Sequence, residues 1–531
     1  MRLGIDFGTT RTRVAAVLGG NYPLISFHSD EGDSQDWYPS LIATQGQRTL
    51  FGLDALRVQY DASWELYRSF KRLLENQDPQ TVLAIGGLEL PLMEWLTRFF
   101  SALRQDLLQR SNLEGKPGNA LQVMAGVPAN ANSNQRFLTL EAMRAAGFEV
   151  LGMVNEPAAA GIEYAQRYRQ TDVTKRREHV AVYDFGGGTF DVSVIRMTGS
   201  VHEIAASEGI SRLGGDDLDE ILLELTLAQA SVAKGTSKFV HRPRLLNLCR
   251  EAKESINSNT RRITVDLGQV SLVGGEVSVP ISAFYERCEP LIAQTVAATE
   301  SALAAVMSED FDDLTSLACV YLVGGSCELP VLARTLRERF GKRVRRSPYP
   351  SAATAIGLAI ASDQDSGYQL QDRFHRHFGV WREREAGTQV FFDPIFSKGT
   401  LLPHPGKSLT VKRRYQPAHN IGHFRFLECS HLDESQEPRG DIVAWDQVLF
   451  PFDPQLAESE LNQVAVRSWS GAQGAMIEEQ YRCDARGMIE VVISNEATGM
   501  VRSFAIRQGN SVRAAQRKSG LRRTATPRRK K

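Results

Sequence analysis

The chain has 531 residues, and its 62 Lys and Arg residues balance 62 Asp and Glu residues. This length exceeds one ordinary hydrophobic core and predicts about two to four domains. The composition is typical of a globular protein and excludes wholesale disorder, and no apolar run reaches the roughly 18–20 residues that a membrane span needs.

An apolar strand that ends in an acidic residue and a glycine turn occurs twice. LGIDFGTTRTRVAAV runs from Leu3 to Val17, and VAVYDFGGGTFDVSVI runs from Val180 to Ile195. Asp6 precedes the first turn and Asp184 precedes the second. We expect each copy to form the same strand–turn–strand unit.

Similar α/β elements follow each copy. In the first half we expect an amphipathic helix over Met93–Arg110, a strand ending at Pro128, and a helix capped by Ser133. A further helix begins around Pro157, which the first turn of a helix tolerates. In the second half, strand VYLVGG (Val320–Gly325) leads into helix ELPVLARTLRERF. The pattern predicts an internal duplication of α/β units.

The sequence changes character after residue 362. Residues 363–379 are polar and are predicted to be a linker. Residues 380–508 contain short runs rich in Val, Ile, Phe and Tyr between turn residues, which is typical of an antiparallel β domain. No long helical pattern follows, so we expect no helical lid. Residues 509–531 are strongly basic and are predicted to be disordered.

The two glycine turns have the chemistry of a phosphate site. Successive backbone N–H groups in a turn bind phosphate oxygens, and glycine lets the backbone come close. An acidic residue beside such a turn would repel phosphate unless a cation lies between them. Asp6 and Asp184 are therefore candidate ligands of a largely hydrated Mg²⁺. Neither a GxxxxGK[ST] run nor a GxGxxG fingerprint is present.

Six motifs carry a resemblance to a known family. GIDFGTT, GVPAN, NEPAAA, DFGGGTFD, LGGDDLD and LVGGS occur in the order found in the 70-kDa heat-shock (DnaK-type) chaperones. The resemblance implies a duplicated actin-like (ribonuclease H-like) ATPase domain over residues 1–362. An all-β substrate-binding-like domain would follow over residues 380–508.

The resemblance also implies roles for individual residues. Lys71, Glu156, Asp191 and Thr189 would serve hydrolysis. Asp6, Asp184 and Glu156 would hold Mg²⁺, mostly through water. Pro128 and Arg136 would form the switch between domains. The ATP or ADP site would comprise Gly8, Thr9, Thr10, Arg11, Gly186, Gly187, Gly188, Gly214, Gly215, Lys253, Glu254, Asn257, Gly324, Gly325 and Glu328.

Four of these roles have a structural alternative. Lys71 could be a solvated helix lysine, Asp191 could cap a turn, Glu156 could stabilise a helix start, and Pro128 could terminate a strand. The sequence leaves these alternatives open.

The nucleoside side departs from the family pattern. Glu254 and Glu328 stand where the family has two arginines that stack on adenine, and glutamate lacks this stacking. Arg250 and Asn257 also replace the usual residues, whereas Lys253 is retained. Arg11 adds a cation close to the phosphates. We therefore expect weaker nucleotide binding or a looser base preference, and weak coupling through a linker that has few leucines.

The resemblance implies an ATP-dependent chaperone that hydrolyses ATP slowly with Mg²⁺ and binds exposed peptide segments of client polypeptides. A J-domain co-chaperone and a nucleotide-exchange factor would be its partners. Two alternatives are a nucleotide-gated scaffold without significant hydrolysis and, less favoured, a small-molecule kinase of the same superfold.

The ends and the cysteines complete the expectations. The N-terminus has no secretory signal and the six cysteines have no metal or redox spacing, so we expect reduced thiols in a cytoplasmic protein. The basic tail from Arg513 to Lys531 is either a solvated tail or a segment that binds nucleic acid, ribosomes or an anionic surface.

Overall fold

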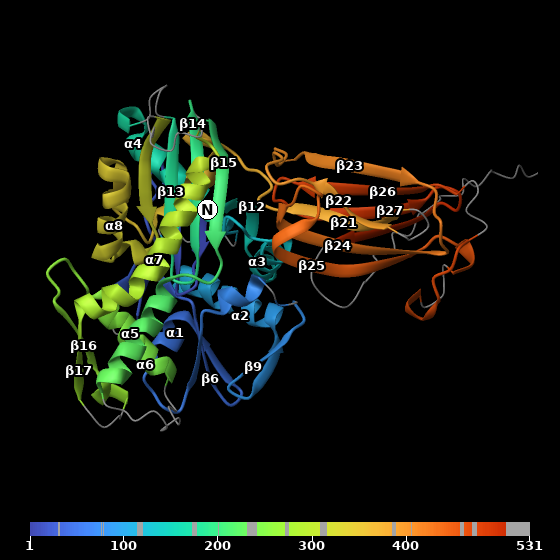
Figure 1. Ribbon diagram of the computed structural model, residues 1–531. Coiled ribbons are helices and arrows are strands. Elements are labelled where there is room, and N and C mark those ends of the chain that lie inside the picture. The colour runs from blue at the N-terminus through green and yellow to red at the C-terminus, as the bar shows by residue number, and fades with distance from the viewer. Residues whose placement is uncertain are drawn as a thin grey trace, which may run out of the picture.

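The computed structural model describes residues 1–29, 32–75, 77, 79–113, 120–172, 178–199, 201–230, 242–270, 275–307, 316–384, 389–404, 406–456, 461–469 and 475–505. They form an α/β body and a β-sandwich that projects from one side of it, next to α3 and β12 (Figure 1). The predicted basic tail lies outside the described residues.

The α/β body has two lobes, each built on one sheet. In the first lobe (residues 1–172) the order is β12-β11-β1-β2-β5. Its strands are β1 (Arg2–Phe7), β2 (Arg11–Ala16), β5 (Tyr38–Pro39), β11 (Gln122–Val127) and β12 (Glu149–Asn155). β1 pairs antiparallel with β2 and parallel with β11.

The second lobe (residues 178–362) repeats this pairing. Its sheet has the order β19-β18-β13-β14-β15-β20. The strands are β13 (His179–Phe185), β14 (Phe190–Thr198), β15 (Val201–Ile210), β18 (Leu317–Val323), β19 (Val344–Arg346) and β20 (Gln369–Gln371). β13 pairs antiparallel with β14 and parallel with β18. The duplication predicted from the sequence is confirmed.

Two helices pack against each other beside the central strands of the lobes. These are α4 (Glu156–Asp172) and α9 (Ala353–Ser362). A Cβ atom on Gly357 would lie only 1.7 Å from the carbonyl oxygen of Ala159, so this crossing requires glycine. The remaining α-helices are α1 (Gly52–Arg57), α2 (Leu92–Gln109), α3 (Ser133–Ala145), α5 (Gly215–Gln229), α6 (Arg242–Glu254), α7 (Ile281–Ala304) and α8 (Pro330–Phe340).

Smaller elements extend the two lobes. Those of the first lobe are β3 (Phe27–His28), β4 (Ser34–Gln35), β6 (Leu41–Gln45), β7 (Arg48–Phe51), β8 (Glu65–Arg68), β9 (Val82–Ile85), β10 (Leu88–Pro91) and the 3₁₀ helix η1 (Phe70–Glu75). Those of the second lobe are β16 (Arg262–Asp266), β17 (Glu276–Pro280) and the 3₁₀ helix η4 (Gly325–Glu328).

Helices α2 and α3 test the sequence patterns. The predicted apolar stripe of α2 is buried, including Trp95, Phe99 and Leu103. The prediction that Ser133 caps α3 is wrong by one residue. Asn132 is the cap, because its side chain accepts from the backbone N–H of Gln135, whose side chain accepts from the N–H of Asn132.

The β-sandwich consists of two four-stranded sheets, β22-β21-β24-β25 and β23-β26-β27-β28. Apolar side chains from both sheets form one core that includes Phe378, Phe450 and Val491. The strands are β21 (His377–Arg384), β22 (Gln389–Phe396), β23 (Ser408–Tyr415), β24 (Ile421–Leu432), β25 (Pro438–Pro451), β26 (Ile477–Asp484), β27 (Ile489–Asn495) and β28 (Met500–Ala505).

The segment between the body and the sandwich is more ordered than the predicted polar linker. β20 pairs in parallel with β15 and adds a strand to the second-lobe sheet. Just beyond it, the Arg373 guanidinium pairs with Glu203 of β15. Pairing between backbone groups requires no particular side chain. The pairing of β20 with β15 therefore could not be predicted from the leucine-poor sequence of the linker.

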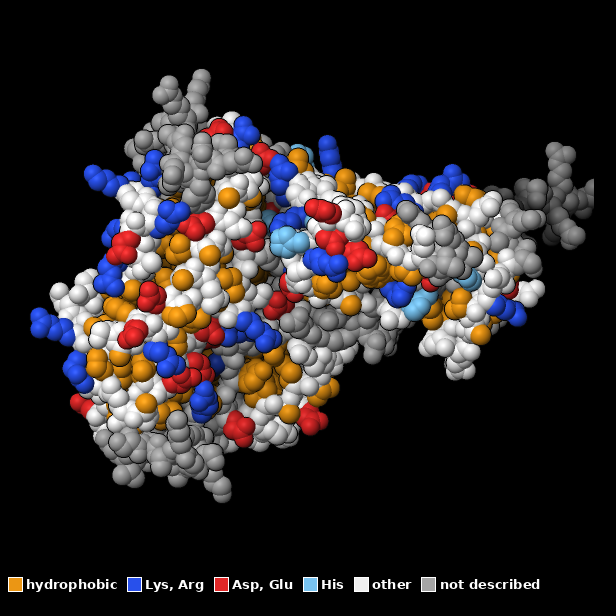
Figure 2. All heavy atoms as spheres, in the orientation of Figure 1, with side chains coloured by type: hydrophobic (Ala, Val, Ile, Leu, Met, Phe, Trp, Pro, Cys, Tyr) orange, Lys and Arg blue, Asp and Glu red, His pale blue; other side chains and the backbone are white. Residues whose placement is uncertain are grey.

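The described residues show three further features. All six cysteines are buried free thiols. In the face shown in Figure 2, basic and acidic side chains are intermingled. None of the described helices combines the length and apolar character that crossing a membrane would need.

A buried ion cluster joins the two sheets of the sandwich. Arg382 of β21 forms hydrogen bonds of 3.0 and 2.8 Å with the Glu479 carboxylate of β26, and a third of 2.6 Å with Asp393 of β22. Glu479 is fully buried and also accepts from the Tyr481 hydroxyl. A buried charged side chain at this position is stabilised only while its oppositely charged partners are present.

Replacing Glu479 with Ala tests this dependence. The change leaves Arg382 with Asp393 alone, and we expect it to lower the free energy of unfolding by about 3 kcal/mol. Urea unfolding of the full chain, followed by tryptophan fluorescence, measures the change. Glu478→Ala is the matched control, because Glu478 pairs with exposed Lys412 and should contribute less than about 1 kcal/mol. Equal losses in the two variants would contradict the prediction.

Candidate nucleotide site

A cavity of about 280 Å³ lies between the two lobes and contains most of the predicted site residues. This volume is near the lower end for small-molecule sites. The predicted residues that line it are Asp6, Gly8, Thr9, Thr10, Arg11, Lys71, Glu156, Asp184, Gly186, Gly187, Gly188, Thr189, Gly215, Lys253, Glu254, Gly324, Gly325 and Glu328.

The two glycine turns face each other across this cavity. A Cβ atom on Gly188 would lie 2.4 Å from the Thr9 hydroxyl oxygen, and one on Gly187 would lie 2.9 Å from the Thr10 methyl group. Only glycine permits such a close approach. We call residues 8–10 the first phosphate turn and residues 186–189 the second phosphate turn. Their opposition provides backbone N–H groups on both sides of one ligand.

Several carboxylates surround a buried lysine at the base of the cavity. Lys71 Nζ donates a 2.6 Å hydrogen bond to Glu156 Oε1, and both side chains are buried. Burial alone would lower the pKa of Lys71, but the carboxylates of Glu156 and Asp6 outweigh it and raise that pKa. Lys71 is therefore a charged, buried cation and not a solvated helix lysine.

Three other carboxyl groups of the site have raised pKa values. Burial and the nearby Glu156 raise the pKa of Asp6 to about 7. Burial, Glu156 and Asp6 raise the pKa of Asp184 well above its ordinary value, and burial and Glu156 raise that of Asp191 to about 7. The site thus has more carboxylates than its lysine balances.

This charge excess suits a cation that keeps its water shell. Within the described ranges, no three His, Cys, Asp or Glu side chains are arranged to bind a metal directly. Glu156 and Asp6 are nevertheless close enough to Asp184 to raise its pKa. Oxygen ligands acting through water are typical of Mg²⁺. The residues present fit a hydrated Mg²⁺ beside the phosphate turns.

Second-lobe residues line the part of the cavity that is predicted to hold the nucleoside. Gly324, at φ 85°, lies so close to the end of β13 that a Cβ would approach the Phe185 carbonyl oxygen to 2.4 Å. Gly214 sits behind the second phosphate turn, where a Cβ would be 2.5 Å from the Gly187 carbonyl oxygen. Asn257 does not line the cavity. It is exposed, and its side chain accepts from the Asn259 N–H in a local turn.

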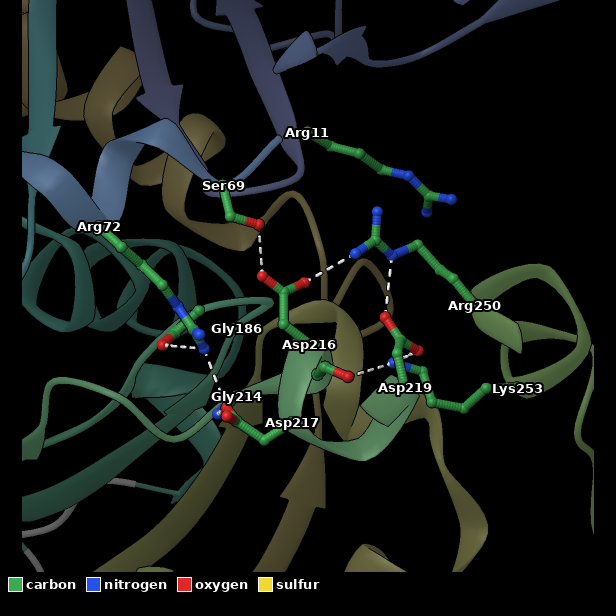
Figure 3. Close-up of polar contacts among 12 residues, drawn as sticks. Arg11, Ser69, Arg72, Gly186, Gly214, Asp216, Asp217, Asp219, Arg250 and Lys253 are labelled. Carbon is green, nitrogen blue, oxygen red and sulfur yellow. Dashed lines mark hydrogen bonds and ion pairs between the residues drawn. The ribbon is translucent and has the colours of Figure 1, made fainter. Parts of the chain in front are cut away.

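Lys253 and Arg250 are held by acidic residues of α5. Lys253 Nζ lies 2.6 Å from Asp219 Oδ1, and Arg250 Nε donates to Asp219 Oδ2 at 3.0 Å. Arg250 also donates to Asp216 at 2.8 Å (Figure 3). Both acidic partners of Arg250 lie within the second lobe. Arg250 therefore does not replace the adenine-stacking arginine that the family has at position 254.

Arg11 crosses the cleft instead. Its guanidinium lies 2.5 Å from the carboxylate of Glu254 on α6 and 4.5 Å from the centre of the Trp37 ring. Both charged side chains remain about one-third exposed, at 32% and 40%. We call this contact the cross-cleft ion pair. It joins the first phosphate turn to the helix that borders the nucleoside side.

The remaining predicted residues lie beside the main cavity. Pro128 and Asp191 line a smaller cavity that also contains Thr9, Lys71 and Thr189. Arg136 of α3 does not line either cavity, and its Nη1 donates to the Arg486 carbonyl oxygen, between β26 and β27 of the β-sandwich, at 3.2 Å. The predicted hydrolysis residues thus come together, whereas Arg136 lies at the contact with the sandwich.

Sequence reasoning missed several residues at the cleft. These are Arg13, Trp37, Ser69, Arg72, Asp216 and Asp219. Asp216 and Asp219 stand inside the LGGDDLD motif and could have been found there. Asp216 lies in the first turn of α5, where an acidic residue stabilises the helix. Trp37 and Ser69 have no local signal in the sequence.

A duplicated α/β body with opposed phosphate turns and a buried lysine defines a nucleotide-binding protein of the actin-like fold class. The sequence model of the family described as "Hsp70 protein" matches residues 111–374. The chain belongs to the Hsp70 family of chaperones, and the resemblance inferred from the six motifs is confirmed.

The similar proteins include chaperone HscA from two enterobacteria. Chaperone protein HscA of Cronobacter sakazakii is 32% identical over 375 residues, which are 68% of this chain and 57% of that protein. Chaperone protein HscA of Escherichia fergusonii is 31% identical over 525 residues, 95% of this chain and 77% of that protein. The Colwellia psychrerythraea HscA homolog is 29% identical over 375 residues and 58% of its length.

Breaking the cross-cleft ion pair should speed nucleotide release. Glu254→Gln removes one charge of a partly exposed pair, which is worth about 0.2–1 kcal/mol. We expect ADP to dissociate about two- to fivefold faster, as measured by stopped-flow fluorescence with a labelled nucleotide. Glu224→Gln, which breaks the exposed Arg287–Glu224 pair within the second lobe, should leave the rate unchanged. Slower release from Glu254→Gln would contradict the prediction, because it would mean that Glu254 diverts Arg11 from the phosphates.

Proposed function

We propose that this protein is an ATP-driven chaperone that hydrolyses the β–γ bond of ATP slowly and binds exposed peptide segments of client proteins. The observation that carries the proposal is the opposition of two phosphate turns above the buried Lys71–Glu156 pair. Residues 1–362 would form the ATPase domain and residues 380–508 the peptide-binding domain, with residues 363–379 between them.

In this proposal the chain's own residues position the phosphates and the attacking water. The N–H groups of both turns, with Thr9, Thr10 and Thr189, bind the β- and γ-phosphates. Lys71 balances the negative charge that develops on the transferred group, and such preorganised charge supplies much of the catalysis in phosphoryl transfer. Asp191 orients the attacking water. Mg²⁺, held through water by Asp6, Asp184 and Glu156, would supply further charge neutralisation.

A polar interface supports communication between the two bodies. Asn155, which directly precedes Glu156, lies 3.3 Å from Asp372 and 3.0 Å from His375 through its side-chain nitrogen. Ser133, at the start of α3, donates to the buried Glu428 carboxylate of β24 at 2.5 Å. These contacts supply coupling that the leucine-poor linker was not expected to give. Pro128 and Arg136 would transmit the nucleotide state.

Replacing Lys71 with Ala tests the hydrolytic part of the proposal. The change removes the buried cation that faces the transferred phosphoryl group, so the single-turnover rate of ATP hydrolysis should fall by on the order of 100-fold or more. Lys342→Ala, at an exposed position, serves as the control and should hydrolyse ATP normally. Hydrolysis that persists in Lys71→Ala would exclude the assigned role.

The same assay separates the alternatives. Binding of ATP·Mg without formation of ADP by the wild-type chain would favour the nucleotide-gated scaffold. Phosphoryl transfer to a polyol would favour a small-molecule kinase, which the β-sandwich gives no reason to expect.

Peptide release tests the chaperone part. If the polar interface transmits the nucleotide state, ATP should accelerate dissociation of a fluorescent apolar peptide by at least about tenfold relative to ADP, a coupling within the usual allosteric range. Asn155→Ala, which removes the side-chain contacts to Asp372 and His375, should reduce that ratio several-fold. Equal release rates in ATP and ADP for the wild-type chain would leave the ATPase and remove the chaperone switch.

Partners and location follow from the same proposal. A J-domain co-chaperone and a nucleotide-exchange factor would regulate the cycle in the cytoplasm. The relatives of this chain are named as chaperones, which supports client polypeptides as its ligands. Binding of the basic tail to nucleic acid or an anionic surface has no support in the described residues.

A further inference from the structure

Lys71 lies in a short segment whose backbone is strained. Ser69 has φ 57°, one of two non-glycine residues with positive φ in the described part of the chain. This left-handed conformation costs a serine free energy and persists only when its surroundings enforce it. Ser69 accepts the Arg72 N–H through its carbonyl oxygen and thereby starts the turn that carries Lys71.

The contact that holds Ser69 comes from the opposite lobe. The Ser69 hydroxyl donates a 2.5 Å hydrogen bond to Asp216 Oδ2 at the start of α5. The other oxygen of Asp216 accepts from Arg250 at 2.8 Å, so the carboxylate is fixed in place (Figure 3). A hydrogen bond to a charged group is stronger than one between neutral groups.

Arg72, on the other side of Lys71, also reaches across the cleft. Its Nη2 donates to the Gly188 carbonyl oxygen of the second phosphate turn at 2.8 Å and to Asp217 at 2.9 Å. Asp217 in turn accepts from the Gly214 N–H at 2.7 Å. Ser69 and Arg72, on either side of Lys71 in the sequence, therefore both contact the second lobe (Figure 3). Lys71 itself pairs with Glu156 of the first lobe.

We infer that Ser69 and Arg72 are positioning residues that place the Lys71 ammonium for hydrolysis only while the two lobes are closed on each other. This inference rests on the proposed role of Lys71. Opening of the cleft would break the contacts to Asp216, Asp217 and Gly188. The Ser69 backbone would then lose the partner that enforces its strained conformation, and the turn that carries Lys71 would be free to relax.

The arrangement makes hydrolysis conditional on domain closure and not only on nucleotide binding. The phosphate turns can bind ATP through backbone N–H groups whether or not the strained turn is held. A charged group accelerates hydrolysis only if its position is maintained in the transition state. Loss of the Ser69 contact should therefore lower the rate of the chemical step more than the affinity for ATP.

The experiment uses the full chain with ATP·Mg under single-turnover conditions, with affinity measured separately by titration. Ser69→Ala keeps the positive φ but removes the hydroxyl. We expect the hydrolysis rate constant to fall by about tenfold, which corresponds to one hydrogen bond to a charged partner, while the dissociation constant changes less than about twofold. Asp216→Asn should give a similar loss, and the double variant should be no slower than the slower single variant.

Two further variants exclude a merely structural effect. Ser69→Asn should recover most of the rate, because asparagine tolerates the left-handed conformation and its amide can donate to Asp216. Ser63→Ala is the matched control, since the Ser63 hydroxyl donates to Asp61 within the first lobe at 2.8 Å. It should hydrolyse ATP at the wild-type rate.

The outcomes are distinct. An unchanged rate in Ser69→Ala, or an equal loss of rate and affinity, would overturn the inference, because the contact would then be either idle or needed only to hold nucleotide. A Ser69→Asn variant as slow as Ser69→Ala would also overturn it. A wild-type chain without hydrolysis, or one insensitive to Lys71→Ala, would instead overturn the proposed function.

Discussion

The buried ion pair between Lys71 and Glu156 is the interaction on which the site depends. Four carboxylates converge where the two lobes meet, and burial and mutual repulsion raise the pKa values of three of them, Asp6, Asp184 and Asp191. Without the lysine, only Arg13 would oppose the charge of these carboxylates beside the two glycine turns. The cation therefore serves both the folded state and the ligand.

The need to balance buried carboxylates explains why the two lobes share a fold but differ in the charges that they bring to the site. Each contributes a strand, an acidic residue and a glycine turn. In the first lobe the register of the sheet places Arg13 opposite Asp6, whereas in the second lobe it places Asp191 opposite Asp184. At these paired positions the second lobe thus brings two carboxylates, whereas the first lobe brings a carboxylate and a cation. Closing the cleft joins complementary halves of one electrostatic arrangement.

Much of the fold and of the phosphate site could be predicted from the sequence, because these features are local. The alternation of strands and helices, the two turns and the apolar stripe of α2 all occupy contiguous residues. Contacts between distant segments could not be predicted. Nothing near Trp37 indicates that Arg11 stacks on it, and nothing near Ser69 indicates a left-handed backbone enforced from α5. The pairing of β20 was missed because strand addition depends on backbone groups, and Asn257 was misplaced because its neighbours form a turn outside the cavity.

The addition of β20 to the edge of the second-lobe sheet has a consequence for the state in which the β-sandwich moves away. Strand β15 would remain paired with β14, but the backbone N–H and C=O groups of Val201–Glu203 that face β20 would lose their partners. A bare sheet edge is a template for any extended chain. Separation of the two bodies would therefore expose a sheet edge on the α/β body, and β20 protects that edge from association with other extended chains while it remains paired.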